Sequence, residues 1–307
     1  MNTQETKENI LKTLLYYDIF DHPLKRDEIF IFLSQNTIPK PDILKAIDSY
    51  SSDRESTFGQ RDGYIYIKPN YHFISKRLQK EKYSRKMWKA ARLVTHIIKR
   101  FPFVRAVLVT GTLSKNSSVK ESDLDFMVIT AKDRLWISRT LLMLFKKIFL
   151  LNNYKFFCIN YYVTEDNLEI EDKNIFTATE IAHIKATFNT ELMDKYVRSN
   201  MWIKNYFPNY TLCDPYLHSS GFKVNNRRSY LQKIFELFFA GRIGDRLNDR
   251  FMRVTSNYWK HKYQDMDESE RNRIFKTTKS ISTAFPGDMQ EKILTEYSNK
   301  LKQFNLD

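Results

Sequence analysis

The chain has 307 residues, of which 42% are hydrophobic, 15% aromatic and 28% charged, and its formal net charge is +14. This apolar content excludes a wholly disordered chain, and a chain with seven glycines and eight prolines is neither collagen-like nor of low complexity. The only two cysteines, Cys158 and Cys213, exclude a disulfide scaffold and a four-cysteine zinc site. We expect a cytoplasmic protein without a membrane partner, because the sequence has no signal peptide pattern and no uncharged apolar run of membrane-spanning length.

Residues 1–75 predict three short helices followed by a hairpin, the order found in a winged-helix module. Asp62-Gly63 before alternating Tyr and Ile residues is the hairpin signal. DNA binding through the third helix is not favoured, because the region carries 9 basic and 11 acidic side chains and that helix sets Lys45 against Asp42 and Asp48. A packing or protein-contact role is the preferred interpretation.

Residues 76–100 predict one long helix with 10 basic side chains and 1 acidic side chain. Both a surface for phosphate, of a nucleotide or a nucleic acid, and a plain solvated face fit this pattern. The apolar residues expected to form its buried stripe are Leu78, Trp88, Ala91, Val94, Ile97 and Ile98.

The middle of the chain alternates strand and helix patterns, and the part after it is mostly helical. β-branched and apolar runs predict strands at Val104–Thr110, Leu124–Thr130 and Phe156–Val163, with a helix at Asp133–Leu151. The further predicted helices are Thr179–Thr187, Glu191–Trp202, Ser229–Tyr258 with a break at Gly241–Gly244, Ser269–Ser282 and Asp288–Phe304.

One stretch combines residues that suit phosphate and metal chemistry. A predicted strand ends in Gly111-Thr112, and ten residues later the next strand opens with Asp123-Leu124-Asp125. Alternate strand residues share a face, so both carboxylates point the same way and repel each other unless a cation lies between them. Such oxygen ligands suit Mg²⁺ or Mn²⁺. A glycine allows phosphate to approach the backbone closely, and Thr112 and Ser114 add hydroxyl groups.

This stretch resembles the signature of the nucleotidyltransferase superfamily related to DNA polymerase beta. The matching residues are Gly111-Thr112, the ten-residue spacing, and the acid-hydrophobic-acid run from Asp123 to Asp125. The resemblance implies an α+β fold with a mixed sheet flanked by helices, a divalent metal at the two aspartates, and nucleoside triphosphate phosphates at Gly111 and Thr112. It also implies transfer of a nucleoside monophosphate to an acceptor hydroxyl or phosphate.

The sequence departs from this family pattern at two points. Thr112 replaces the usual Gly or Ser. The third carboxylate, which the family usually carries on a later strand, is missing, and Asn160 stands at the expected place. An amide cannot accept a proton at neutral pH, so Glu165, Asp166 and Glu169 in the following loop are candidate substitutes.

A Glu-x-x-His pair, Glu180 and His183, lies on a predicted helix. Paired copies of this motif bind metal in helical bundles, but a single copy is more often structural.

We therefore expect a winged-helix-like module at 1–75, a nucleotidyltransferase-like core with a basic lead-in helix at 76–175, and a helical region at 176–307. The expected function is metal-dependent transfer from a nucleoside triphosphate to an RNA, protein or small-molecule acceptor. The alternative is a catalytically weak or inactive nucleotide-binding or scaffold protein, whose winged-helix-like unit contacts a partner or DNA. The missing third acid is the observation that supports this alternative.

Overall fold

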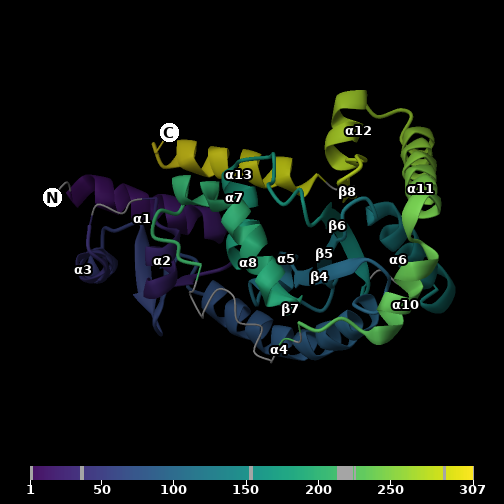
Figure 1. The fold of residues 1–307 in the computed structure, drawn as a ribbon. Coiled ribbons are helices and arrows are strands. Elements are labelled where there is room, and N and C mark those ends of the chain that lie inside the picture. The colour runs from purple at the N-terminus through teal and green to yellow at the C-terminus, as the bar shows by residue number, and fades with distance from the viewer. Residues whose placement is uncertain are drawn as a thin grey trace.

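The fold of the chain is mixed α+β, with a small and a larger sheet flanked by helices in a computed structural model (Figure 1). The structure describes residues 3–34, 38–151, 155–212, 224, 226–285 and 288–306. Cys213 lies outside these residues. The expected α+β class with a mixed sheet flanked by helices is confirmed.

The amino-terminal unit consists of three helices and an antiparallel sheet in the order β1-β3-β2. Its elements are α1 (Thr3–Asp18), β1 (Leu24–Lys25), α2 (Arg26–Phe32), α3 (Lys40–Ser52), β2 (Phe58–Arg61) and β3 (Tyr64–Ile67). The predicted hairpin is confirmed, because Asp62 and Gly63 connect β2 to β3 with positive φ angles of 53° and 79°. A two-residue turn with both φ angles positive has the twist that joins two antiparallel strands.

Ion pairs neutralise the charges of α3, the helix that would have to read DNA in a winged-helix protein. Lys45 lies 3.8 Å from Asp42, and Asp48 lies 2.6 Å from Arg26. Lys40 also lies 2.7 Å from a carboxylate, that of Asp27. These pairs favour the packing or protein-contact interpretation of the unit.

α4 (Phe73–Ile98) is the predicted long basic helix, and it connects the amino-terminal unit to the larger sheet. Ala91 and Ile98 are buried against that sheet. Near the start of α4, the buried Arg77 donates to both carboxylate oxygens of Glu28, at 2.8 and 2.7 Å. The prediction for Leu78 was wrong, since its side chain is 49% exposed. Arg77 takes the inward position there, because the amino-terminal unit offers it a buried carboxylate.

The larger sheet has the strand order β7-β4-β5-β6-β8. Its strands are β4 (Val104–Val109), β5 (Asp125–Thr130), β6 (Cys158–Thr164), β7 (Lys185–Phe188) and β8 (Ile281–Thr283). β5 and β6 are parallel and are joined by α6 (Leu135–Phe149), whereas the other neighbouring strands are antiparallel. The three strands predicted from β-branched runs are thus confirmed, together with the helix between the second and the third.

Both edge strands come from the region that the sequence predicts to be helical. The helix predicted at Thr179–Thr187 ends early: α7 (Ile175–His183) stops before Ile184, and β7 follows. The helix predicted at Ser269–Ser282 is likewise split into α12 (Glu268–Ile274) and β8. Short apolar runs fit a strand or a helix equally well, and here pairing with β4 and β6 decides for strands.

Of the remaining helices, the predicted single helix Ser229–Tyr258 is divided in two, but the break lies at Phe239 and Ala240 and not at the predicted Gly241–Gly244, which is helical. The remaining helices are α8 (Thr190–Ser199), the 3₁₀ helix η1 (Met201–Asn205), α10 (Tyr230–Phe238), α11 (Gly241–Lys262) and α13 (Met289–Gln303). In the residues that the structure describes, no helix combines the length and the apolar character needed to cross a bilayer.

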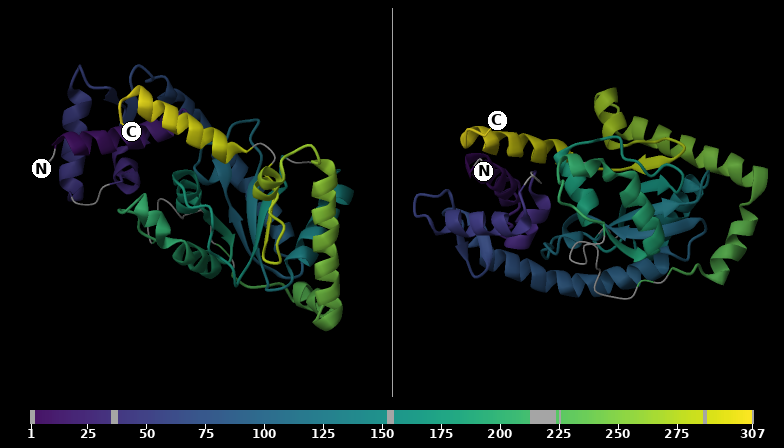
Figure 2. Two further views of the ribbon diagram at one scale, coloured as in Figure 1. Left: turned by 90° about the horizontal axis from the view of Figure 1, so that it is seen from above. Right: turned by 60° about the vertical axis from the view of Figure 1, so that its left-hand side comes forward.

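The amino-terminal unit shares one hydrophobic core with a face of the larger sheet. Buried residues of α1 and α2 form a continuous cluster with Leu108 and Met127 of the sheet and with Ile181 of α7. α13 lies along α1 (Figures 1 and 2), where Lys300 Nζ donates to Asp18 at 2.8 Å. The unit is therefore packed into the body of the protein rather than attached to it by a linker.

Candidate functional site

A tight backbone turn follows β4 and begins the one-turn helix α5 (Gly111–Ser114). Gly111 has a φ of +64°, and a Cβ atom built there would lie 2.5 Å from Asp125 Oδ2. Both the left-handed conformation and the close carboxylate disfavour a side chain at this position, because a Cβ atom there would have to displace Asp125. The structure thus brings Gly111 and Asp125 into direct proximity, as the sequence predicts.

Asp125 is half-buried at the start of β5, and it faces other acidic groups. Burial raises the pKa of its carboxyl to about 6, and the negative charges of Glu180 and Asp123 act in the same direction. A hydrogen bond with Cys158 and the charge of Lys115 oppose this rise in the pKa. The carboxylate therefore lies in an environment with a local excess of negative charge, which a cation would offset.

Asn160, at the place of the family's third acid, contacts Asp125 directly. Its Nδ2 donates to Asp125 Oδ1 at 3.0 Å from the neighbouring strand β6. The amide therefore stabilises the carboxylate by a hydrogen bond, but it adds no negative charge and no proton acceptor.

Glu180 of α7 supplies the second carboxylate of the site. The sequence did not indicate this role for Glu180. Its Oε2 accepts from the Gly111 amide at 3.3 Å, and its Oε1 accepts from Lys115 Nζ at 2.6 Å. Lys115 also donates to the Gly111 carbonyl at 3.3 Å. The neighbouring His183 takes no part, because its Nδ1 lies 2.9 Å from the Thr179 carbonyl and its ring is buried. The structural interpretation of the Glu-x-x-His pair thus holds for the histidine, while the glutamate holds the Gly111 turn and lines the large cavity.

Asp123, Thr112 and Ser114 take three different places. Asp123 precedes β5 and is exposed, outside the lining of the cavity on which Asp125 lies. Thr112 is exposed and lines that cavity. Ser114 is buried and donates to the Gly111 carbonyl at 2.9 Å, so it fixes the turn. The sequence predicts that Ser114 binds phosphate, but its position does not fit this role, because its hydroxyl is used within the turn.

The three acids that follow β6 do not replace the missing carboxylate. β5 and β6 run parallel from Asp125 and Cys158, so Glu165 lies at the opposite end of the sheet. There it pairs with Arg105 at 3.9 Å. Asp166 lies 3.6 Å from Lys132, and Glu169 lies 2.7 Å from Lys173. The parallel register carries Glu165 and Asp166 away from Asp125, whereas Glu169 is exposed and is paired with Lys173.

A large cavity of about 680 Å³ opens beside Gly111 and Asp125. Its walls come from the amino-terminal unit, the sheet, α7 and α13. Three basic and five acidic side chains line it: Lys115, Arg273, Lys276, Asp125, Asp172, Glu180, Asp288 and Glu296. Arg273 pairs with Asp288 at 2.5 Å, and Lys276 pairs with Asp172 at 3.0 Å.

Apolar side chains form most of the wall between these charged groups. They include Met127, Tyr161, Phe176, Ile181, Tyr196 and Ile293. The volume lies in the range of small-molecule sites, about 300–1,000 Å³. The cavity therefore has the size and the chemistry to hold an organic ligand whose charged end meets Asp125 and Gly111.

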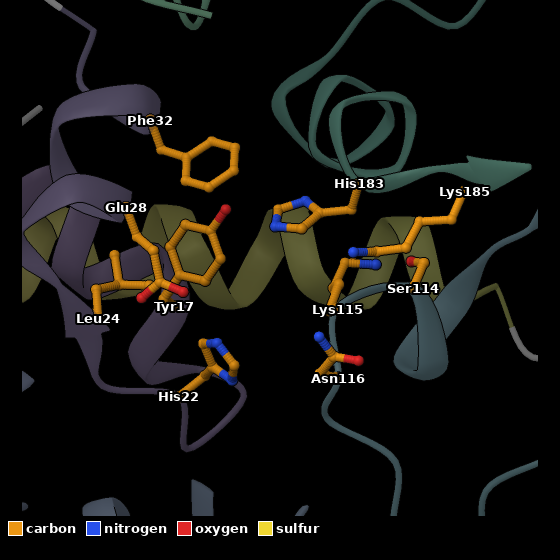
Figure 3. Close-up of a pocket in the computed structure, with 10 residues that line it drawn as sticks. All are labelled: Tyr17, His22, Leu24, Glu28, Phe32, Ser114, Lys115, Asn116, His183 and Lys185. Carbon is orange, nitrogen blue, oxygen red and sulfur yellow. The ribbon is translucent and has the colours of Figure 1, made fainter. Parts of the chain in front are cut away.

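A second, small cavity of about 10 Å³ lies on the other side of Lys115. Figure 3 shows side chains of the amino-terminal unit facing side chains of the turn and of α7 across it. Burial lowers the pKa of His22 and of His183 well below the ordinary value, and the charge of Lys115 adds to this effect. His183 stacks on Phe32 with ring centroids 4.7 Å apart. This volume suits about one water molecule, so the small cavity is a packed seam.

The donor set at Asp125 fits a divalent cation that completes its shell with other ligands. The described residues contain no group of three or more His, Cys, Asp or Glu side chains arranged to hold a metal ion. Mg²⁺ is commonly held by one or two carboxylates and takes its other oxygens from water and substrate phosphates. Asp125, with excess negative charge around it, matches that requirement.

Comparison with known proteins gives no relative for the chain. No protein-family model matches it, and neither does a curated protein or a solved structure. The site must therefore be interpreted from its own geometry.

Proposed function

We propose that the protein is a metal-dependent nucleotidyltransferase, which moves a nucleoside monophosphate from a nucleoside triphosphate to an acceptor. The observation that carries the proposal is the turn at Gly111, whose backbone lies against the Asp125 carboxylate at the mouth of the large cavity. Phosphate groups bind where backbone amides and a cation meet. This turn offers the Gly111 amide, which donates to Glu180 here, and the Asp125 carboxylate for the cation.

The chain's own residues have distinct tasks in this proposal. Gly111 and Thr112 bind the phosphates through backbone and hydroxyl groups, and Asp125 and Asp123 hold Mg²⁺ or Mn²⁺. The bound cation offsets negative charge on the phosphate oxygens during transfer. Glu180 withdraws from the Gly111 amide when a phosphate takes its place, because both ligands use the same donor. The apolar walls of the large cavity exclude water around the base and the acceptor.

The charges of the large cavity bear on the acceptor. Acidic side chains outnumber basic ones there, and each lining Lys or Arg pairs with a carboxylate, at 2.5 to 3.0 Å. This acidic excess repels any polyanion, and for the triphosphate the bound cation would offset it. A polyanionic acceptor has no such counter-charge inside the cavity, so a small molecule or a protein hydroxyl fits better.

Thermal unfolding with each nucleoside triphosphate, with and without Mg²⁺ or Mn²⁺, tests the site. A ligand at about 100 times its Kd adds about 2.7 kcal/mol. For a protein of this size we expect Tm to rise by about 5–10 °C with one triphosphate and metal. Asp123→Asn/Asp125→Asn should abolish the rise in Tm, and transfer of label from the α-phosphate should be lost with it. A rise in Tm that is independent of metal would contradict the proposal.

A second function has specific support from Asn160. Its amide occupies the place of the third acid and donates to Asp125, so the chain would bind a nucleotide without transferring it. This alternative predicts the same metal-dependent rise in Tm but no labelled product with any acceptor. Asn160→Asp distinguishes the two functions, since restoring the acid would create transfer only in a protein that lacks it.

A further inference from the structure

The outward face of α4 carries four basic side chains in two helical turns. We call them the basic stripe: Lys82, Arg85, Lys86 and Lys89. Residues spaced by three, four and seven lie on one side of a helix, so the four side chains point the same way. All four residues are exposed, whereas Ser84 and Met87 between them are buried.

No acidic residue interrupts the sequence around the basic stripe. Residues 82–120 contain ten Lys or Arg residues and neither Asp nor Glu. Glu81, just before this segment, lies 3.0 Å from Arg77 on the inner side of the helix. Lys120 is exposed and lies beside the stripe, since Tyr83 Oη donates to its carbonyl at 3.5 Å. Lys120 therefore adds a fifth exposed cation beside the stripe.

The stripe differs from the other cations discussed above in having no counter-charge. Within the described part of the chain, none of its four side chains lies within ion-pair distance of a carboxylate. No residue of α4 lines the large or the small cavity. The stripe is thus a surface separate from both cavities, on the helix that runs along the lower edge of the molecule in Figure 1.

We propose that the basic stripe and Lys120 bind the phosphodiester backbone of a nucleic acid without reading its bases. Unpaired Lys and Arg side chains on one face are the electrostatic footprint of such binding. An anionic membrane fits less well, because a membrane-surface helix needs a free apolar face, and that of α4 is buried on the sheet.

The surface adjoins the loop that carries the candidate site. Ser118 N donates to Ser84 Oγ at 3.0 Å, and Trp88 Nε1 donates to Asn116 Oδ1 at 2.9 Å. A nucleic acid on the stripe would therefore be held next to the segment that joins Thr112 to Asp123. The proposal stands whether or not the protein transfers nucleotides, because the stripe shares no residue with the site.

Fluorescence anisotropy with two labelled probes tests this surface. The probes are a single-stranded RNA of about 20 nucleotides and a DNA duplex of about 20 base pairs, measured from about 50 to 200 mM salt. For five phosphate contacts, the logarithm of the association constant should fall with a slope of about −3.5 for the single strand and about −4.5 for the duplex. The two probes show which nucleic acid supplies the backbone.

Charge-neutralised variants locate the binding surface. Lys82→Gln/Arg85→Gln/Lys86→Gln/Lys89→Gln should reduce the steepness of the salt slope by about 3. The matched control neutralises four exposed cations that are ion-paired and lie outside α4: Lys45→Gln/Arg61→Gln/Lys132→Gln/Lys173→Gln. It removes the same charge and should keep the wild-type slope. Circular dichroism and Tm show whether each variant is folded. If the fourfold variant unfolds, Lys86→Gln/Lys89→Gln replaces it and should reduce the steepness of the salt slope by about 1.5.

Three results would overturn the proposal. The first is an equal loss of slope in the control with ion-paired cations, which would reduce the effect to net charge. The second is no binding of either probe at the lowest salt. The third is binding to phosphatidylserine vesicles with no binding to either nucleic acid, which would assign the surface to a membrane.

Discussion

Two polar regions meet at Lys115, which lines both cavities, and they differ in how their charges are balanced. In the seam around the small cavity, Glu28 receives both ends of the Arg77 guanidinium, and His22 is held neutral by burial. At the rim of the large cavity, Asp125 and Glu180 face each other, and the pKa of Asp125 is raised. The paired charges of the seam thus stabilise the fold. At the rim, by which we mean Asp125 and Glu180, two carboxylates repel each other, and a bound cation would remove this repulsion.

Breaking the buried ion pair of the seam should have the largest effect. Arg77→Met leaves the Glu28 carboxylate buried without its main cation, which costs about 3–5 kcal/mol of unfolding free energy. Urea unfolding measures this loss. The double variant Arg77→Met/Glu28→Gln should regain a large part of it, and a double variant no more stable than Arg77→Met would show that the pair does not act as a unit.

Acid should weaken the seam through its two histidines. Their folded pKa values are lowered, so the unfolded chain takes up protons first, and stability is lost as the pH falls below the unfolded pKa of about 6.5. Between pH 7.5 and 5.5 the pair should contribute a loss of about 2–3 kcal/mol.

Urea unfolding at both pH values, in wild type and His22→Gln/His183→Gln, isolates the histidine contribution. The double variant should lose about 2–3 kcal/mol less on acidification than wild type. The exposed His261→Asn is the control and should follow wild type. Equal pH dependence in all three proteins would remove the histidines from the explanation.

At the rim, Gly111→Ala should combine a moderate loss of stability with loss of the ligand response. A left-handed alanine costs about 1–2 kcal/mol, and its Cβ must displace the Asp125 carboxylate. We expect the metal-dependent rise in Tm with nucleotide to disappear. Gly63→Ala, also at positive φ but with no atom within 4 Å of the added Cβ, is the matched control. It should lose similar stability yet keep the response.

The smallest effect on stability should come from Asp125→Asn, and its direction is the sharpest test of the comparison. Removing a charge that faces Glu180 should leave unfolding free energy unchanged or raise it by about 1 kcal/mol. The exposed Asp123→Asn should change it by less than about 0.5 kcal/mol. A clear destabilisation by Asp125→Asn would mean that the charge of Asp125 stabilises the folded protein, as the paired charge of Glu28 does in the seam.

The sequence predicts the local parts of the site because their signals are local. Gly111 follows β4, Asp125 begins β5 and Asn160 lies within β6, all three strands are predicted from their β-branched runs, and the structure brings the three residues together. Glu180 could not be found in this way. It reaches Gly111 from 69 positions along the chain, and its helix has no pattern that marks an inward carboxylate.

The edge strands show the same limit for the fold. β7 and β8 are short, and their residues become strands only because β4 and β6 offer them unpaired backbone groups. The local sequence of a segment does not indicate which strand it will pair with. The amino-terminal hairpin, in contrast, is specified by the two residues of its own turn.

The position of α13 has a consequence for synthesis. It forms part of the wall of the large cavity and contacts α1 across 282 positions of the chain. The wall can therefore be completed only after α13 has emerged from the ribosome, long after the Gly111 turn has emerged. A nascent chain would present the Gly111 turn without the complete cavity wall, so ligand binding should report completed folding. The packing of α13 on α1 should be among the slow folding steps, because its contacts are distant in sequence.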